Sequence, residues 1–138
     1  MAVTIPAPAD EAPFEERGEP AVSLVASFVV PAFNEEANIG RFLADLEACP
    51  ELFGPSSRLV IVDDGSTDAT AAIVEAYDGP LPVELLRMGV NQGPGAAFRA
   101  GFRHVLAAQQ GEFLVVTLES DTTSDLATLP RMLARAAE

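Results

Sequence analysis

RLVIVDDGSTD, the stretch from Arg58 to Asp68, changes within five residues from the pattern of a buried strand to that of a polar turn. The four apolar residues before the acids are mostly β-branched, which predicts a strand with both faces buried. Asp63 and Asp64 follow with no spacer, so we expect the acid pair where the strand leaves the sheet. The remaining residues are typical of a turn before a helix, with Ser66 or Thr67 as the helix cap.

The same succession occurs three more times along the chain. Strand patterns at 23–30, 83–87 and 113–118 are followed by the polar segments PAFNEE (31–36), MGVNQGPGAA (88–97) and ESDTTSD (119–125). After every polar segment, apolar residues recur at helical spacing. They predict four buried helix faces: Ile39, Phe42, Leu43 and Leu46; Ile73, Val74 and Tyr77; Phe98, Gly101, Phe102 and Val105, with the glycine allowing close packing; and Leu126, Leu129 and Leu133.

Four alternating strand–helix units predict an α/β fold of three layers, α/β/α, with a mainly parallel sheet. In such sheets, ligands bind beyond the carboxyl ends of the strands. Because all four polar segments follow strands, they should meet at one edge of the sheet. The sequence therefore predicts a polar cleft there.

The composition fits one domain and excludes several classes of protein. The 138 residues carry 21 acids and 8 bases, a formal net charge of -13, and 49% of them are hydrophobic. A field of this sign repels nucleic acid, which we exclude as a partner. All the bases are arginine, whereas a P-loop and a two-component receiver each need a lysine. The G-x-G at Gly93 to Gly95 follows the third strand, whereas a dinucleotide-binding fold needs it after the first.

Residues 1–21 differ from the rest and are predicted to be a disordered acidic tail rich in Pro and Ala. The folded domain should therefore span residues 22–138. Cys49 is the single cysteine, and the chain shows neither a signal-peptide pattern nor an apolar run of about 20 residues. We expect a cytoplasmic location, with peripheral attachment to the inner face of the membrane as an option within it.

ESDTTSD places two acids directly behind the fourth strand. Ser124 and Asp125 are expected to cap the last helix, but a cap does not need Glu119 and Asp121 as well. At spacing i, i+2 in an extended segment, these two side chains point the same way and repel each other. A hard cation such as Mg²⁺ or Mn²⁺ would bridge them, since it takes oxygen ligands and is commonly held by one or two carboxylates plus substrate phosphates.

Together the four segments resemble family 2 glycosyltransferases, the inverting group with the GT-A fold that includes the dolichol-phosphate mannose synthases and many bacterial polysaccharide enzymes. The matching residues are VVPAFNEEANI, IVDDGSTDAT, NQGPGAAFRAGF and ESDTTSDL, in the order of the family. The resemblance covers residues 27–136. It implies a GT-A sheet that lacks its C-terminal part, because members of this family continue into an acceptor-binding region.

The resemblance also implies a site. Pro31, Phe33 and Glu35 would line the nucleobase and ribose pocket. Asp63 would contact the base or the ribose, and Asp64 would support the loop that follows the second strand. Asn91 and Gly93 would lie in the loop that passes the nucleotide. Glu119 and Asp121 occupy the D-x-D position, whose acids hold Mg²⁺ or Mn²⁺. Because the first acid is a glutamate, Asp121 is the firmer ligand, and Thr123 would add a further contact. His104, in mid-helix, is interpreted as a structural or surface residue.

The implied function is metal-dependent binding of a UDP-, GDP- or dTDP-sugar and inverting transfer of the sugar to a glycan or a lipid-linked acceptor. The alternative is a nucleotide-sugar-binding module without catalytic activity. Transfer needs a base, and we expect none in this chain. An incomplete sheet also predicts exposed apolar surface, with self-association or a separate C-terminal partner segment that covers it.

Overall fold

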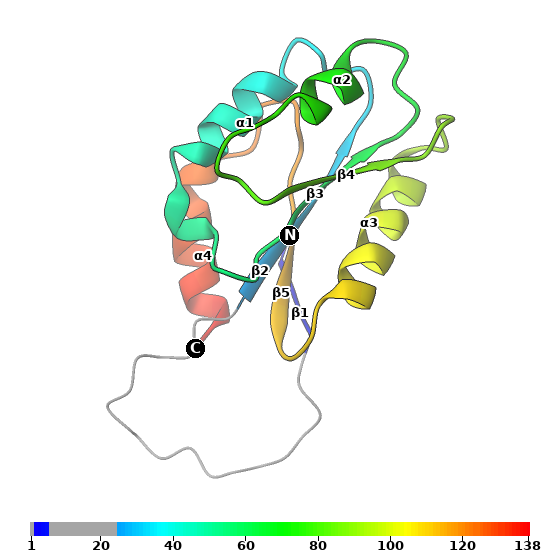
Figure 1. Ribbon diagram of the computed structural model, residues 1–138. Helices are drawn as coiled ribbons and strands as arrows, with labels where there is room; N and C mark the ends of the chain where they lie inside the picture. The colour runs from blue at the N-terminus through cyan, green and yellow to red at the C-terminus, as the bar shows by residue number, and fades with distance from the viewer. Residues whose placement is uncertain (1, 6–24) are drawn as a thin grey trace.

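The computed structural model of the protein describes residues 2–5 and 25–138. Its centre is a five-stranded sheet in the order β1-β5-β2-β3-β4 (Figure 1). The strands are β1 (Ala2–Ile5), β2 (Val25–Ala32), β3 (Leu59–Asp63), β4 (Val83–Arg87) and β5 (Phe113–Thr117). The four later strands pair in parallel, and β1 is antiparallel to β5. The predicted parallel α/β sheet is confirmed.

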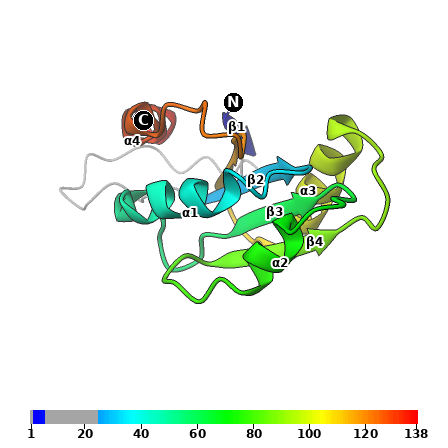
Figure 2. The same ribbon diagram turned by 90° about the horizontal axis from the view of Figure 1, so that it is seen from above.

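Each face of the sheet has its own apolar core, because successive strand residues point to opposite sides. The helices α1 (Ile39–Glu47), α2 (Thr70–Glu75) and α4 (Leu129–Ala136) cover one face, and α3 (Pro94–Ala108) covers the other (Figure 2). Two short 3-10 turns, η1 (Pro50–Leu52) and η2 (Leu126–Thr128), complete the described elements. In β2, Phe28 and Val30 enter the first core and Val29 enters the second. The three predicted layers are present.

The predicted helix faces are the packed ones, but one helix start differs. All four predicted apolar residues of α1 are buried. A Cβ at Gly101 would collide with the side chain of Val29, so this glycine lets α3 approach β2 as predicted. Asp125 caps η2 by accepting the N–H of Ala127. However, α2 begins only at Thr70, with Ala69 at its N-cap and no side-chain cap, so the predicted cap by Ser66 or Thr67 is wrong.

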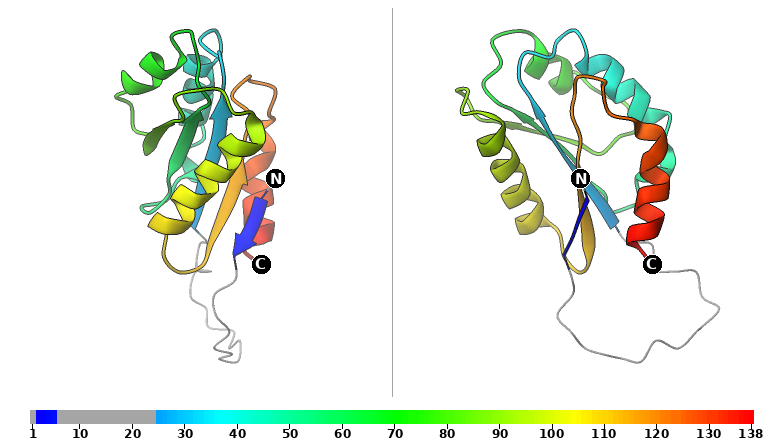
Figure 3. Two further views of the ribbon diagram at one scale, coloured as in Figure 1. Left: turned by 90° about the vertical axis from the view of Figure 1, so that its right-hand side faces the viewer. Right: turned by 180° about the vertical axis from the view of Figure 1, so that it is seen from behind.

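The N-terminal segment also departs from the prediction. Residues 2–5 were expected in a disordered tail, but they form β1, with Ala2 opposite Val116 and Ile5 opposite Phe113 (Figure 3). The physical reason is an open strand edge: β1 pairs with backbone groups of β5 that would otherwise lack partners. Three of its four residues are β-branched, which suits a strand. The prediction for residues 6–21 and the predicted domain start at residue 22 lie outside the described residues.

The order of the strands creates a crevice at the carboxyl edge of the sheet. β2 lies between β3 and β5, so the chain first moves to one side, toward β4, and then returns through α3 to β5 on the other side. The loops after β2 and β5 therefore diverge, which is where open α/β sheets bind ligands.

Exposed apolar side chains are scattered over the described surface. The large ones are Phe33, Val90, Leu106 and Met132, and they lie on four separate loops or helices. They form no single apolar face around β5, whose free edge is taken by β1. Self-association and a partner segment stay predictions.

Candidate functional site

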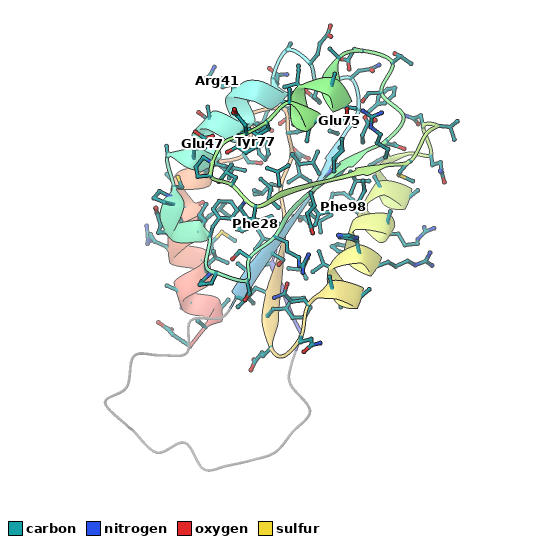
Figure 4. All side chains as sticks on the ribbon, viewed as in Figure 1. Phe28, Arg41, Glu47, Glu75, Tyr77 and Phe98 are labelled. Atoms are coloured by element: carbon teal, nitrogen blue, oxygen red, sulfur yellow. The ribbon has the colours of Figure 1, made fainter. Side chains whose placement is uncertain are left out.

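The carboxyl edge of the sheet holds a cleft of about 350 Å³ to which all four parallel strands contribute a loop. The predicted site residues line it, except Asp63 and Thr123: Pro31 near the end of β2, Phe33 and Glu35 after β2, Asp64 after β3, Asn91 and Gly93 after β4, and Glu119 and Asp121 after β5. Ala32, Pro94, Phe98 and Ser120 complete the lining. Figure 4 shows Phe98 on the side of α3 that faces the sheet. We call this hollow the carboxyl-edge cleft.

Asp63 ends β3 and lies below the cleft surface. It is buried, and its Oδ1 accepts the N–H of Ser66 at 3.2 Å, which shapes the turn that follows the strand. Its contact with a base or ribose stays a prediction.

Asp64 connects two loops of the cleft. It is 3% exposed, and its two carboxylate oxygens accept the N–H of Gln92 at 2.7 Å and the N–H of Gly93 at 3.0 Å. Gly65 brings the same loops into contact, because its φ is +71° and a Cβ there would collide with the backbone of Val90 and Asn91. The loop after β4, and with it the start of α3, is therefore anchored to the end of β3.

The acidic loop after β5 is fastened to β2 and holds its two outer acids together. Ser120 is buried and donates its hydroxyl to the carbonyl oxygen of Pro31 at 3.1 Å, which ties the loop across the crevice. The Thr123 hydroxyl lies 2.6 Å from Asp121 Oδ1 and 3.2 Å from Glu119 Oε2, so one hydroxyl joins both carboxylates. Hydrogen bonds from the hydroxyl and the N–H of Thr123 lower the pKa of Asp121, which keeps that carboxylate ionised.

Two of the cleft loops contain unusual backbone. Asn34 and Thr122 are the described non-glycine residues with positive φ, at +52° and +66°. One lies in the loop after β2 and the other in the loop after β5. Strained backbone of this kind persists only where surrounding contacts hold it, and it is frequent at functional sites.

The carboxyl-edge cleft is acidic. Of the described residues that line it, Glu35, Asp64, Glu119 and Asp121 are acids and none is basic. Among the described residues, no group of three or more acidic, histidine or cysteine side chains could enclose a metal ion. Glu119 and Asp121 offer carboxylate oxygens, the ligand type of a hard cation that takes one or two protein carboxylates and completes its shell with water and ligand phosphate.

A larger hollow of about 620 Å³ lies at the opposite, amino edge of the sheet, and no predicted site residue lines it. Two of its polar lining residues bond to each other, with Arg58 Nη1 2.6 Å from Glu84 Oε1. His104, which is outside the lining, places its Nε2 3.2 Å from Glu84 Oε2. This contact gives His104 the structural role predicted for it. The carboxyl-edge cleft is the smaller hollow, but it lies at the crevice where the strand order reverses.

Sequence patterns did not reveal the contribution of Ser120. It stands between two acids, where the pattern drew attention only to the carboxylates. The available signal was the alternation of side chains in an extended segment: if Glu119 and Asp121 point outward, the residue between them points inward. A small hydroxyl at that place can bond to the neighbouring strand.

The chain is an α/β protein whose parallel sheet carries an acid-lined cleft where its strand order reverses, the place where open α/β sheets bind ligands. The chain belongs to glycosyl transferase family 2, whose model matches residues 27–138. Among curated proteins, it is 35% identical over 117 residues to the undecaprenyl-phosphate 4-deoxy-4-formamido-L-arabinose transferase of Pseudomonas paraeruginosa. That match covers 83% of this chain and 33% of that protein. The chain thus spans about a third of the length of the curated relatives it matches.

Solved structures show the same fold. S. aureus TarS 1-349 in complex with UDP-GlcNAc has a TM-score of 0.65 and 31% identity, over 80% of this chain and 30% of that chain. The mannosyltransferase PcManGT from Pyrobaculum calidifontis, in complex with GDP-Man and Mn²⁺, has a TM-score of 0.71 and 24% identity, over 96% of this chain and 36% of that one. Both confirm the predicted GT-A architecture. Within the described part of the chain, no helix is long and apolar enough to cross a membrane.

Proposed function

We propose that this chain forms the nucleotide-sugar site of an inverting family 2 glycosyltransferase and binds its donor together with Mg²⁺ or Mn²⁺. The observation that carries the proposal is the carboxyl-edge cleft, whose lining combines an aromatic ring and an acid from the β2 loop with a pair of carboxylates from the β5 loop. Family membership and the likeness to TarS, solved with UDP-GlcNAc, support it.

The two ends of the cleft suit the two ends of a nucleotide sugar. Phe33 is 44% exposed and, with Pro31, offers apolar surface to a flat base. Glu35 follows Phe33 in the same loop, lines the cleft and can accept hydrogen bonds from ribose hydroxyls. At the other end, Glu119 and Asp121 would hold the cation. A bound cation would neutralise the negative charge that develops on the departing diphosphate.

The described lining contains no basic residue, so the cation should matter more for binding the diphosphate than for binding the nucleoside. A diphosphate entering this cleft meets four carboxylates, and like charges repel strongly where water is partly excluded. Binding of a nucleoside diphosphate should therefore depend on the cation, whereas binding of the uncharged nucleoside should not. The start of α3, with Gly93 and Pro94 in the lining, presents a positive dipole end to the cleft.

The acceptor is proposed to be a glycan or a lipid-linked molecule. The name of the Pseudomonas relative contains undecaprenyl-phosphate, a polyprenyl phosphate, which favours the lipid-linked class. We propose accordingly that the protein acts in the cytoplasm, at the inner face of the membrane that holds such lipids.

Calorimetric titration of UDP, GDP and dTDP, each with and without Mn²⁺, tests the proposal. One of the three should bind with Mn²⁺ and bind far more weakly without it. Asp63→Ala should weaken binding of the nucleoside as well as the diphosphate if Asp63 contacts base or ribose. No binding of any of the three with Mn²⁺ rejects the proposed site, and binding without acceptor-dependent turnover selects the non-catalytic alternative.

A further inference from the structure

Side chains join the loop after β2 to the loop after β3. Three consecutive backbone N–H groups of the first loop donate to side chains of the second: Asn34 to Ser66 Oγ at 3.0 Å, Glu35 to Thr70 Oγ1 at 2.8 Å and Glu36 to Asp68 Oδ2 at 3.2 Å. In return, Thr67 N–H donates to Asn34 Oδ1 at 2.8 Å and Ala69 N–H donates to Glu36 Oε2 at 3.0 Å. We call these contacts between residues 34–36 and 66–70 the loop clamp.

The loop clamp explains why two helix starts lack caps of their own. Neither α1 nor α2 has a side-chain hydrogen bond from its N-cap residue. The turns that lead into both helices still carry N–H groups that need partners, and each turn finds them in the other loop. The polar residues that resembled local caps in the sequence therefore act across a gap of more than thirty residues.

Glu36 and Asp68 contribute to the clamp from outside the cleft. Neither of them lines it, whereas Phe33 and Glu35 in the first loop and Asp64 in the second do. Burial acts to raise the pKa of Asp68, but hydrogen bonds donated by Thr70 and by the Glu36 N–H outweigh it and lower the pKa. The acid thus stays ionised and bonded to the loop opposite.

We propose that Glu36 and Asp68 are positioning residues for the nucleoside end of the carboxyl-edge cleft, holding Phe33 and Glu35 in place against Asp64 without touching the ligand. The inference rests on the proposed function, because a nucleotide is the ligand that the cleft is proposed to hold. Glu36, the second acid of the NEE segment, and Asp68, the last acid of the DDGSTD segment, thus position other residues and do not contact the ligand.

Electrostatics separates positioning from a simple charge effect. Glu36 and Asp68 are acids beside a cleft that receives an anion. Replacing either by a neutral residue reduces repulsion, so the Coulomb term alone predicts tighter binding of a nucleoside diphosphate. Loss of the loop clamp predicts weaker binding. Whether the affinity for the nucleoside diphosphate rises or falls therefore distinguishes the charge effect from the loss of the loop clamp.

The choice of substitutions at Glu36 and Asp68 follows from how many carboxylate oxygens of each residue accept hydrogen bonds. Asp68 uses both, since Oδ2 accepts from Glu36 and Oδ1 accepts the N–H of Thr70 at 2.9 Å. An asparagine offers only one acceptor, so Asp68→Asn loses either the bond from Glu36 across the clamp or the bond from Thr70 that holds the Asp68 side chain in place. Glu36 uses only Oε2, so Glu36→Gln can keep its bond and Glu36→Ala cannot. Glu112→Ala is the matched control: it removes an equal charge from an exposed residue just before β5, at the opposite edge of the sheet.

The experiment is calorimetric titration of the full chain with UDP, GDP and dTDP in the presence of Mn²⁺, together with thermal denaturation of each variant. For the nucleotide that the wild type binds, Glu36→Ala and Asp68→Asn should weaken binding by about tenfold or more. Glu36→Gln should stay close to wild type, and Glu112→Ala should match it. Because Glu36 is exposed and Asp68 is half-buried, unfolding temperatures should change little.

Unchanged or tighter binding by Glu36→Ala and Asp68→Asn, with a wild type that binds, overturns the inference and leaves the proposed function intact. Equal losses in Glu36→Gln and Glu36→Ala also overturn it, because the glutamine retains the hydrogen bond. If Asp68→Asn does not fold, the comparison of Glu36→Ala with Glu36→Gln alone tests the inference. A wild type that binds none of the three nucleotides overturns the proposed function and this inference together.

Discussion

Asp64→Asn should destabilise the protein more than any other single neutralisation of an acid in the cleft. Both oxygens of Asp64 accept backbone N–H groups, at 2.7 Å and 3.0 Å, and the residue is 3% exposed, so water cannot replace a lost partner. An asparagine keeps one acceptor and turns an NH₂ group toward the other N–H. A hydrogen bond to a charged group contributes about 1.5–3 kcal/mol, and a buried donor without a partner costs about 1–3 kcal/mol. The expected loss in the free energy of unfolding is therefore about 2–4 kcal/mol.

Urea denaturation followed by circular dichroism measures this loss, provided that the m-value stays constant. Asp125→Asn is the matched control, because that exposed aspartate accepts only one backbone N–H, from Ala127 at 3.1 Å. Its loss should stay at or below about 1 kcal/mol. If Asp64→Asn costs no more than Asp125→Asn, the loop after β4 is not anchored by Asp64, and the account of that wall of the cleft is wrong.

Asp121→Asn should weaken Mn²⁺-dependent nucleotide affinity by at least about tenfold, with a smaller loss for Glu119→Gln; equal affinities in wild type and Asp121→Asn, measured by calorimetry, would contradict the metal role. Gly101→Ala should lower the free energy of unfolding by about 1–3 kcal/mol through overpacking against β2, and an unchanged urea midpoint would refute that contact. Burial and the hydrogen bond to Glu47 raise the pKa of Tyr77 above 10.0. The unfolded phenol then loses its proton at lower pH than the folded one, so its contribution to stability is complete below about pH 10 and declines as pH rises through the folded pKa. In a cysteine-free background, Tyr77→Phe should remove that alkaline decline; a curve of stability against pH that keeps it would exclude the tyrosine.

The parallel strands were predictable because each is an uninterrupted apolar run that ends in polar residues, a pattern set by burial on both faces. β1 was not, because four residues carry too little pattern to indicate a strand. Its pairing depends on the open edge of β5, which exists only once the sheet has formed. The start of α2 was missed for a similar reason. Ser66 and Thr67 are good caps by type, but their partners lie in another loop.

The candidate site was predictable as a set of residues, since eight of the ten named line one cleft, but the partner of each acid was not. Within the DDGSTD segment, Asp63 bonds to its own turn, Asp64 to the loop 28 and 29 residues later, and Asp68 to a residue 32 positions earlier. Composition treats these acids as one anionic cluster, whereas Asp64 and Asp68 each have an N–H donor on both carboxylate oxygens, and Asp63, with one N–H donor, lies outside the cleft lining. The Glu119–Asp121 pair has less compensation, with one hydroxyl shared between the two carboxylates and one N–H from Thr123. A cation that enters the cleft gains most where carboxylate charge is least compensated, which favours the end of β5 over the richer acid cluster at the end of β3.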